Sequence, residues 1–157
     1  PDWRLEIWGK GELEAALRQQ IEESGLEGKV CLMGYTAEVL QKMSQASLYL
    51  LTSMFEGFGL VLIEAMSVGL PLVSYMCPTG PKTIIEDGQN GYLVAVGDEK
   101  TFAERVGQLI EDEPLRKQMG QAGLKELEKY RIEDIAQRWM QLFRELLAKK
   151  SSRRNSR

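Results

Sequence analysis

The stretch from Phe55 to Met66 constrains the fold of this chain more than any other part of its sequence. It follows an apolar run, 48–52, that has the length and composition of a strand, and it places Gly57 and Gly59 on either side of Phe58. A second apolar run comes directly afterwards. This pattern predicts a strand, a glycine-rich turn and the beginning of a helix. The unpaired N–H groups at such a helix N-terminus favour an anion, and glycines let a phosphate approach the backbone closely.

Two carboxylates, Glu56 and Glu64, lie on either side of this turn. Eight residues of helix rise about 12 Å, which is more than the about 5–9.5 Å between the two carboxyl groups of a glycosidase. The spacing suits two hydrogen-bond acceptors at opposite ends of one long polyhydroxylated ligand, with phosphates between them. The alternative is a buried helix in an ordinary α/β domain, in which Glu64 is a paired or snorkelling carboxylate and the glycines serve only the turn.

Short apolar runs alternate with amphipathic segments along most of the chain. The predicted strands are 5–8, 29–33, 48–52, 71–75 and 92–95. The predicted helices are 12–23, one that begins at Thr36 and carries Val39, Leu40 and Met43, and then 82–86, 98–111, 114–130 and 132–146. This alternation predicts an α/β fold with a doubly wound, Rossmann-like parallel sheet followed by C-terminal helices. Ligands of such sheets bind outside the carboxyl ends of the strands, so the loops that follow the strands should converge on one cleft.

The composition of the chain limits the kinds of active site and metal site that it can contain. The chain has 157 residues, of which 43% are apolar, and this suits one domain with a hydrophobic core. Histidine is absent, which excludes a Ser-His-Asp triad and a histidine-based zinc site within the chain. Cys31 and Cys77 lack the spacing of metal ligands, so we interpret them as free thiols in a reducing cytoplasm.

The charge of the chain is unevenly distributed. Its net charge is -3, but the last nine residues hold five positive charges, so residues 1–148 carry a net charge of -8. An acidic body argues against a nucleic-acid partner. We expect 1–148 to form the folded domain and 149–157 to be a basic, disordered tail. The tail is interpreted either as a solvated segment or as a contact to an acidic membrane surface.

The spacing of Glu56 and Glu64 is similar to the paired-glutamate motif, Glu-x7-Glu, of retaining glycosyltransferases with the GT-B fold, the glycosyl transferases group 1. Four further segments resemble that family in the same order along the chain: 69–73, 77–81, 85–94 and 97–98. The resemblance covers residues 2–145. It implies that the chain is the C-terminal, donor-binding domain of such an enzyme, which is one half of a GT-B fold.

The resemblance also implies a ligand and the roles of individual residues. The donor is a nucleotide-sugar, a UDP-sugar in preference to a GDP-sugar, and no metal ion or cofactor is implied. Glu64 would hold the ribose hydroxyls, and Glu56 would be the catalytic carboxylate beside the sugar. Backbone amides would face the sugar and the distal phosphate. The implied donor-binding residues are Gly57, Phe58, Gly59, Leu60, Val61 and Glu64, together with Gly34 and Tyr35 at the nucleobase and Lys82 at the phosphates.

Lys82 and Tyr35 each have a second interpretation. Lys82 falls in the first turn of a predicted helix, where the dipole disfavours a cation by about 0.3–1 kcal/mol and a ligand phosphate would offset that cost. The alternative is a lysine that points into solvent. Tyr35, next to Gly34, lies where relatives hold the nucleobase, and its ring would stack on the base. The alternative is a half-buried tyrosine that only packs.

The resemblance begins late in the family pattern. Relatives carry an earlier strand, a loop whose Arg and Lys neutralise the diphosphate, and an N-terminal domain that supplies most of the acceptor site. We therefore expect this chain to be a fragment that lacks the first strand of its sheet and is inactive alone. The whole enzyme would transfer a hexose to a glycan, lipid or polymer in polysaccharide biosynthesis, in the cytoplasm or at the inner face of the membrane.

Two alternatives to this function stay open. One is a sugar-nucleotide epimerase of related fold, and the other is a non-catalytic module for nucleotide-sugar binding or assembly. The last predicted helix adds an expectation of its own. Its apolar face, with Trp139 and Phe143, would be unshielded in the fragment and would then promote self-association.

Overall fold

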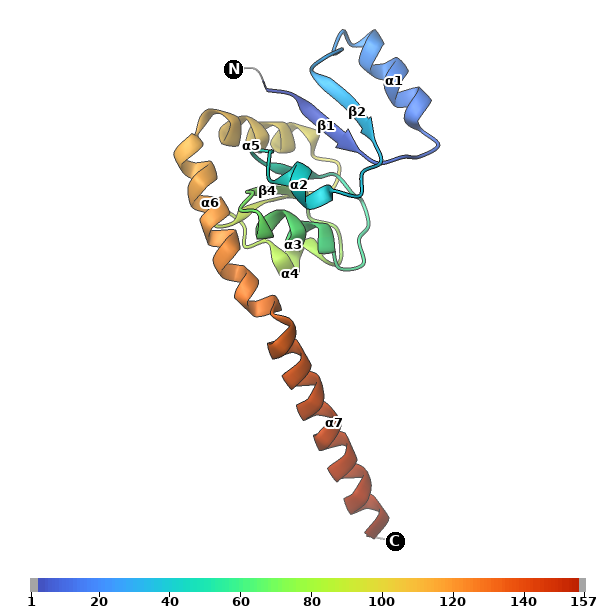
Figure 1. Ribbon diagram of the computed structural model, residues 1–157, viewed down its shortest axis with the longest axis vertical. Helices are drawn as coiled ribbons and strands as arrows, with labels where there is room; N and C mark the ends of the chain where they lie inside the picture. The colour runs from blue at the N-terminus through green and yellow to red at the C-terminus, as the bar shows by residue number, and fades with distance from the viewer. Residues whose placement is uncertain (1–2, 156–157) are drawn as a thin grey trace. The chain divides into compact units, whose positions relative to one another are not determined.

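The computed structural model describes the backbone of residues 3–155 and the side chains of residues 3–150. It consists of two compact units, Pro1–Val39 and Leu40–Arg157, whereas the sequence predicted one domain over 1–148 (Figure 1). That single domain stays a prediction.

The first unit is a strand–helix–strand element. Strand β1 (Leu5–Trp8) pairs in parallel with β2 (Val30–Gly34), and helix α1 (Glu14–Glu23) connects them. The two glycines after α1 end it as expected, since Gly25 and Gly28 have φ of 62° and 77°. None of the residues of α1 is buried. In residues 3–39, the described part of this unit, no side chain is buried.

The second unit contains a three-stranded parallel sheet in the order β3-β4-β5. Its strands are β3 (Tyr49–Leu51), β4 (Leu72–Tyr75) and β5 (Gly91–Val94). Short helices precede and connect these strands: α2 (Val39–Met43), α3 (Leu60–Ser67) and α4 (Pro81–Ile84). The longer helices α5 (Glu99–Glu111), α6 (Glu113–Glu126) and α7 (Ile132–Asn155) follow β5, and the 3₁₀ helix η1 (Leu127–Tyr130) lies between α6 and α7.

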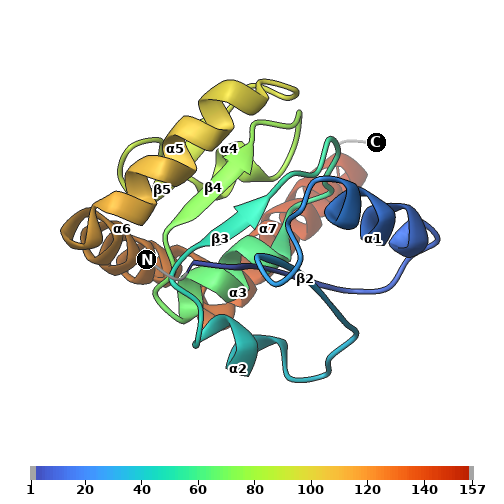
Figure 2. The ribbon, with the colours of Figure 1, turned by 90° about the horizontal axis from the view of Figure 1, so that it is seen from above.

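Helices cover both faces of this sheet, with α3 on one side and α5 on the other (Figure 2). Successive strand residues point to opposite faces, so Leu72 packs towards α3 while Val73 packs towards α5. Both side chains are fully buried. Burying an aliphatic side chain of this size contributes about 1.5–3 kcal/mol, so the two apolar layers hold the unit together.

The helices of the second unit begin at the capping residues that the sequence contains. Asp98 accepts a hydrogen bond from the Thr101 N–H (3.0 Å) at the beginning of α5, and Asp112 accepts one from the Leu115 N–H (2.9 Å) at the beginning of α6. The hydrogen bond from Thr101 lowers the pKa of the Asp98 carboxyl. These caps explain why the predicted boundaries at 98 and 114 lie close to the observed ones.

The strand order agrees with the expected α/β class, which is confirmed: both sheets are parallel and alternate with helices. In residues 3–155 the hydrogen bonds between strands form two separate sheets, the pair β1-β2 and the triplet β3-β4-β5.

The C-terminal end differs from the sequence-based expectation. A disordered tail was predicted for 149–157, but α7 continues to Asn155. The residues after Ser151 have no apolar side chain, yet a helix that is already formed extends at little cost because each added residue gains one backbone hydrogen bond. Residues 156 and 157, which the same prediction included, lie outside the described residues.

Candidate functional site

Two loops of the second unit meet beyond the carboxyl ends of β3 and β4. The Thr79 hydroxyl donates a hydrogen bond to the backbone carbonyl of Glu56. A Cβ atom added to Gly80 would lie 2.6 Å from the carbonyl oxygen of Phe58, so only glycine allows this approach. Both loops were singled out in the sequence, and the structure brings them together at one edge of the sheet.

Helix α3 begins at this edge without a side-chain cap. Gly59 occupies the N-cap position with φ 84° and ψ 47°, a left-handed conformation that favours glycine. The N–H of Leu62 already donates to the carbonyl of Gly59 (2.9 Å). The N–H groups of Leu60 and Val61 have no partner within the helix, because the first turn never does. The beginning of α3 thus presents backbone donors and the positive end of a helix dipole.

The two carboxylates predicted for the site lie in the loop and on the helix. Glu56 is half-buried in the loop before α3, and Glu64 is exposed on α3. Burial raises the pKa of the Tyr49 phenol, and the negative charges of Glu56 and Glu64 raise it further. Tyr49 was not predicted as a site residue, and its sequence position inside a strand gave no signal for it.

Phe58, at the tip of the loop, is braced by a residue far along the chain. The rings of Phe58 and Tyr130 pack edge to face with centroids 6.2 Å apart. The Tyr130 hydroxyl donates to the carbonyl of Thr83 (2.9 Å) in α4. Burial and the charge of Glu126 raise the pKa of Tyr130. One tyrosine therefore ties the loop before α3 to α4, and sequence reasoning missed it because the contact spans distant segments.

Lys82 lies in the first turn of a helix, as predicted. Gly80 has φ 86°, Pro81 is the first residue of α4, and Lys82 follows it with an exposed side chain. Gly80, two residues before Lys82, brings this part of the backbone close to the carbonyl of Phe58. This position suits either a phosphate contact or a solvated lysine.

Gly34 and Tyr35 belong to the first unit. Gly34 ends β2 with φ 73°, and its carbonyl accepts a hydrogen bond from the Gly9 N–H (2.8 Å). Tyr35 follows directly and is 72% exposed. Both lie at the carboxyl end of the β1-β2 sheet, where ligands of parallel sheets bind. Their role at a nucleobase stays a prediction.

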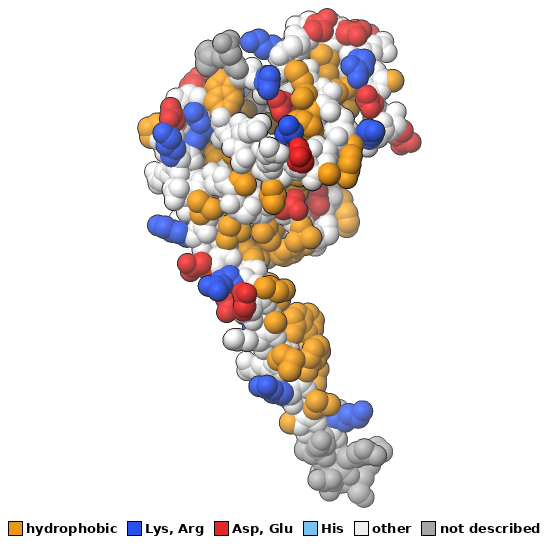
Figure 3. Space-filling view, in the orientation of Figure 1, with side chains coloured by type: hydrophobic (Ala, Val, Ile, Leu, Met, Phe, Trp, Pro, Cys, Tyr) orange, Lys and Arg blue, Asp and Glu red, His pale blue; other side chains and the backbone are white. Residues whose placement is uncertain are grey.

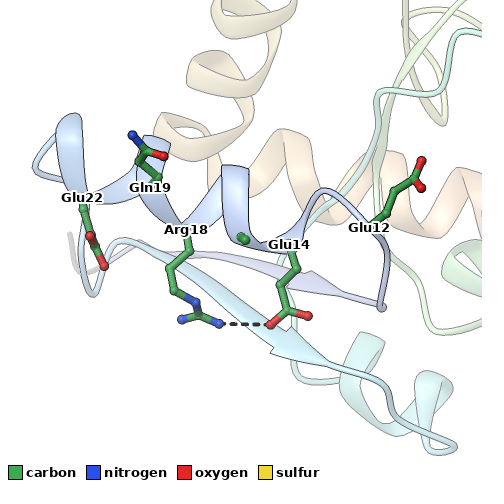
Figure 4. A pocket seen from close by; sticks show the side chains of 6 residues that line it. Glu12, Glu14, Arg18, Gln19 and Glu22 are labelled. Carbon is green, nitrogen blue, oxygen red and sulfur yellow. Dashed lines mark hydrogen bonds and ion pairs between the residues drawn. The ribbon is translucent and has the colours of Figure 1, made fainter.

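The first unit also has a hollow of about 510 Å³ along α1, which none of the predicted site residues lines (Figure 4). Arg18 points across it to Glu14 at 3.1 Å, and Glu12 and Glu22 complete a rim with more negative than positive charge. Such a rim disfavours phosphate, so this hollow does not compete with the edge at α3.

The described part of the chain has neither a metal-binding cluster nor a membrane-spanning helix. Among these residues, no group of three or more His, Cys, Asp and Glu side chains is placed to hold a metal ion. Within the same range, none of the helices is both long enough and apolar enough to span a membrane.

Comparison with known proteins gives a consistent result. Residues 1–126 match the family model described as glycosyl transferases group 1. A curated exopolysaccharide phosphotransferase of Streptomyces coelicolor is 36% identical over 155 residues, which covers 98% of this chain and 16% of that protein.

Two solved structures resemble the chain closely. A Staphylococcus aureus TarM mutant in complex with fondaparinux, alpha-GlcNAc-glycerol and UDP has a TM-score of 0.85 at 33% identity, over 89% of this chain and 29% of that one. Anabaena HepE in complex with UDP-glucose has a TM-score of 0.81 at 28% identity, over 90% of this chain and 41% of that one. The chain spans between 16% and 39% of the length of eight curated relatives.

Proposed function

Because this chain belongs to the family of glycosyl transferases group 1, we propose that it is the part of a retaining glycosyltransferase that binds the nucleotide-sugar donor, and that the donor is a UDP-sugar. The observation that carries the proposal is the beginning of α3, which has no side-chain cap. Glu56 lies in the loop that precedes this helix, and Glu64 lies one turn into it. The choice of UDP over GDP is supported by relatives solved with UDP or UDP-glucose.

In this proposal the diphosphate lies over the beginning of α3. The N–H groups of Leu60 and Val61 donate to the distal phosphate, and Gly57 and Gly59 leave room for the phosphate to approach. Glu64 follows Leu60 by one helical turn, so it is on the same face of α3. Its exposed carboxylate accepts hydrogen bonds from the two vicinal hydroxyls of the ribose.

Catalysis in this proposal is mainly electrostatic. When the bond between sugar and diphosphate breaks, negative charge accumulates on the leaving diphosphate. The amides at the beginning of α3 are fixed by the helix and stabilise that charge without reorganising, and the ammonium group of Lys82 adds a positive charge to them. Glu56, held by the hydrogen bond of its carbonyl to Thr79, lies beside the sugar. Its negative charge stabilises the positive charge that builds on the anomeric carbon.

The acceptor and the setting of the enzyme complete the proposal. The acceptor is a glycan, lipid or polymer bound by another part of the complete protein, and the reaction belongs to polysaccharide biosynthesis in the cytoplasm. The basic residues at the end of α7 favour a position at the inner face of the membrane. Gly34 and Tyr35 contribute a stacking surface for the uracil ring.

A second candidate function rests on the identity to the Streptomyces phosphotransferase over nearly the whole chain. The two reactions break different bonds of the same donor. Transfer of the sugar breaks its bond to the diphosphate and releases UDP. Transfer of the sugar 1-phosphate breaks the bond between the bridging oxygen of the diphosphate and the phosphorus atom next to the sugar, and releases UMP. Analysis of the nucleotide product separates the two functions, and we expect UDP.

Steady-state kinetics of the complete enzyme test the roles of the two carboxylates. Glu64→Gln should raise the KM for donor with little change in kcat, because ribose is bound equally in the ground state and the transition state. Glu56→Gln should mainly lower kcat, because its interaction strengthens in the transition state. A folded Glu56→Gln variant with unchanged kcat removes Glu56 from the mechanism. If either variant is impaired to the same extent in donor KM and in kcat and also has a lower Tm, that carboxylate supports the fold and has no specific role in the reaction.

A further inference from the structure

Tyr130, the last residue of η1, contacts both segments that carry the proposed phosphate ligands. Its ring packs edge to face on the ring of Phe58, with centroids 6.2 Å apart, and its hydroxyl donates to the carbonyl of Thr83 at 2.9 Å. Phe58 directly precedes the N-cap glycine of α3, and Thr83 follows Lys82 in α4. One side chain therefore links the beginning of α3 to the helix of Lys82.

The loop before α3 depends on this contact because its own backbone is weakly restrained. Gly57 and Gly59 lie on either side of Phe58, and glycine has more backbone freedom than any other residue. Helix α3 also begins without a side-chain cap. Within residues 57–59 Phe58 alone has a side chain beyond hydrogen. The packing of its ring on Tyr130 therefore restrains the whole segment.

Helix α4 also depends on contacts from outside. It has four residues, and a single helical turn is unstable by itself. The carbonyl of Thr83 lies in the last turn, where carbonyl groups have no partner within the helix, and the Tyr130 hydroxyl satisfies it. Asn90, which is fully buried, donates to the next carbonyl of the helix at 3.1 Å. Of these two residues, Tyr130 is the one whose ring also packs on Phe58.

Apolar packing holds Tyr130 itself in place. Its ring packs against the buried cluster that contains Leu62 of α3 and Ile84 of α4. Figure 3 shows hydrophobic side chains gathered over α3 and α4 on the surface of the second unit. The core therefore fixes Tyr130, and Tyr130 in turn fixes the loop and α4.

We propose that Tyr130 is a positioning residue for the diphosphate of the donor. It keeps the beginning of α3 and the helical turn of Lys82 in a fixed relative position, so that both bind the distal phosphate together. Groups that are held in place bind a phosphate more tightly than mobile groups, because they lose less conformational entropy on binding. Tyr130 acts through these groups and does not touch the donor. The inference rests on the proposed function, since it takes the phosphates to lie over the beginning of α3.

Inhibition of the complete enzyme by UDP and by UMP tests the inference. UMP keeps the ribose but lacks the distal phosphate, so it does not use the amides of Leu60 and Val61. Tyr130→Leu removes both contacts of the tyrosine and should weaken inhibition by UDP about tenfold, because the displaced loop misplaces the groups that bind the distal phosphate. Inhibition by UMP should be unchanged.

A conservative variant separates the two contacts of Tyr130. Tyr130→Phe keeps the ring against Phe58 and loses the hydrogen bond to Thr83, so it should weaken inhibition by UDP only about threefold. The double variant Phe58→Leu/Tyr130→Leu should lose no more UDP affinity than Tyr130→Leu, because both substitutions remove the same ring contact. Additive losses would show that the two residues act independently and would overturn the inference.

Arg116→Met is the matched control for a general loss of stability. Arg116 donates to the carbonyls of Leu109 and Ile110, at 2.6 Å and 2.9 Å, near the end of α5. Because α5 covers the opposite face of the sheet from α3, this variant should lower the Tm without changing inhibition by either nucleotide. If it weakens inhibition by UDP as much as Tyr130→Leu does, the effect of Tyr130 is one of stability, and the inference is wrong.

Glu64→Gln distinguishes a failure of this inference from a failure of the proposed function. The ribose is common to both nucleotides, so this variant should weaken inhibition by UDP and by UMP by the same factor. If it weakens neither, or if UDP does not inhibit the enzyme, the proposed donor site is wrong and the inference falls with it. If Glu64→Gln behaves as expected but Tyr130→Leu weakens neither nucleotide or weakens both equally, only the positioning role of Tyr130 is wrong.

Discussion

The two units use the same strand–helix–strand connection, yet only one of them has a core. In residues 3–39, which cover the described part of the first unit, no side chain is buried, and α1 lies open. In the second unit α3 buries Leu62, Ala65 and Met66 completely. The difference lies in the sheet: three strands covered on both faces exclude water from two layers, whereas two strands with one helix exclude it from neither. A parallel strand pair becomes stable only when both of its faces are covered.

This contrast bears directly on the candidate site. Glu56, Glu64 and Lys82 stand on elements of the second unit, whose core restrains them. Gly34 and Tyr35 stand on the first unit, whose strands have little packing behind them. The residues proposed to bind the phosphates and ribose are thus restrained by a buried core, whereas the residues proposed for the nucleobase are not.

The largest expected difference between the units is in stability. Leu62→Ala should reduce the free energy of unfolding by about 2–5 kcal/mol, because the side chain is fully buried and leaves a cavity. Leu17→Ala is the matched change on α1, where the side chain is 38% exposed, and it should cost less than about 1 kcal/mol. Urea denaturation followed by circular dichroism measures both values. Equal losses would contradict the claim that only the second unit has a core.

The next largest effect concerns ligand binding. The isolated chain should bind UDP weakly, and Glu64→Gln should reduce the affinity about tenfold, or about 1.4 kcal/mol, through loss of the ribose contact. Glu22→Gln removes the same charge from the hollow along α1 and should change nothing. Isothermal titration calorimetry with UDP, and with GDP for comparison, gives the affinities. Tight binding of a ligand unrelated to nucleotides would argue against a donor site.

A smaller effect is expected at the brace between the loops. Tyr130→Phe removes the hydrogen bond to the Thr83 carbonyl but keeps the ring packed on Phe58, so we expect a loss of about 1 kcal/mol. Tyr35→Phe removes a hydroxyl from a largely exposed ring of the first unit and should leave the unfolding free energy unchanged. Thermal unfolding of both variants makes the comparison. An unchanged Tm in Tyr130→Phe would show that ring packing alone holds the loop.

The smallest expected effect is a dependence on alkaline pH. Burial, together with Glu56 and Glu64, raises the pKa of Tyr49 above its ordinary value of 10.0. The protonated phenol thus contributes stability that is fully present below pH 10 and is lost as the pH rises through the raised pKa. Between about pH 9 and about pH 11 the wild-type chain should lose more stability than Tyr49→Phe. Urea midpoints measured at both pH values test this. A loss of the same size in both chains would assign the alkaline sensitivity to other groups.

The sequence by itself determined the elements and the family. Short apolar runs and helical apolar patterns predicted all five strands and most helices within a few residues, because local side-chain spacing governs which face of an element avoids water. Asp98 marked a helix beginning because a cap is a contact between residues three apart. The motif around Glu56 and Glu64 indicated the family, and the family match confirms it.

The tertiary structure decided what depends on contacts between distant segments. The Thr79 hydrogen bond to the Glu56 carbonyl, the Tyr130 brace and the raised pKa of Tyr49 appear only after the chain has folded. The division of the strands into a pair and a triplet likewise depends on which neighbours each strand finds. Local spacing encodes local backbone geometry, whereas these features depend on how the burial of the whole core brings separate loops together. The composition of the end of α7 predicted disorder, but this segment is helical to Asn155. The preceding helix favours this conformation, because each residue added to a formed helix gains one backbone hydrogen bond.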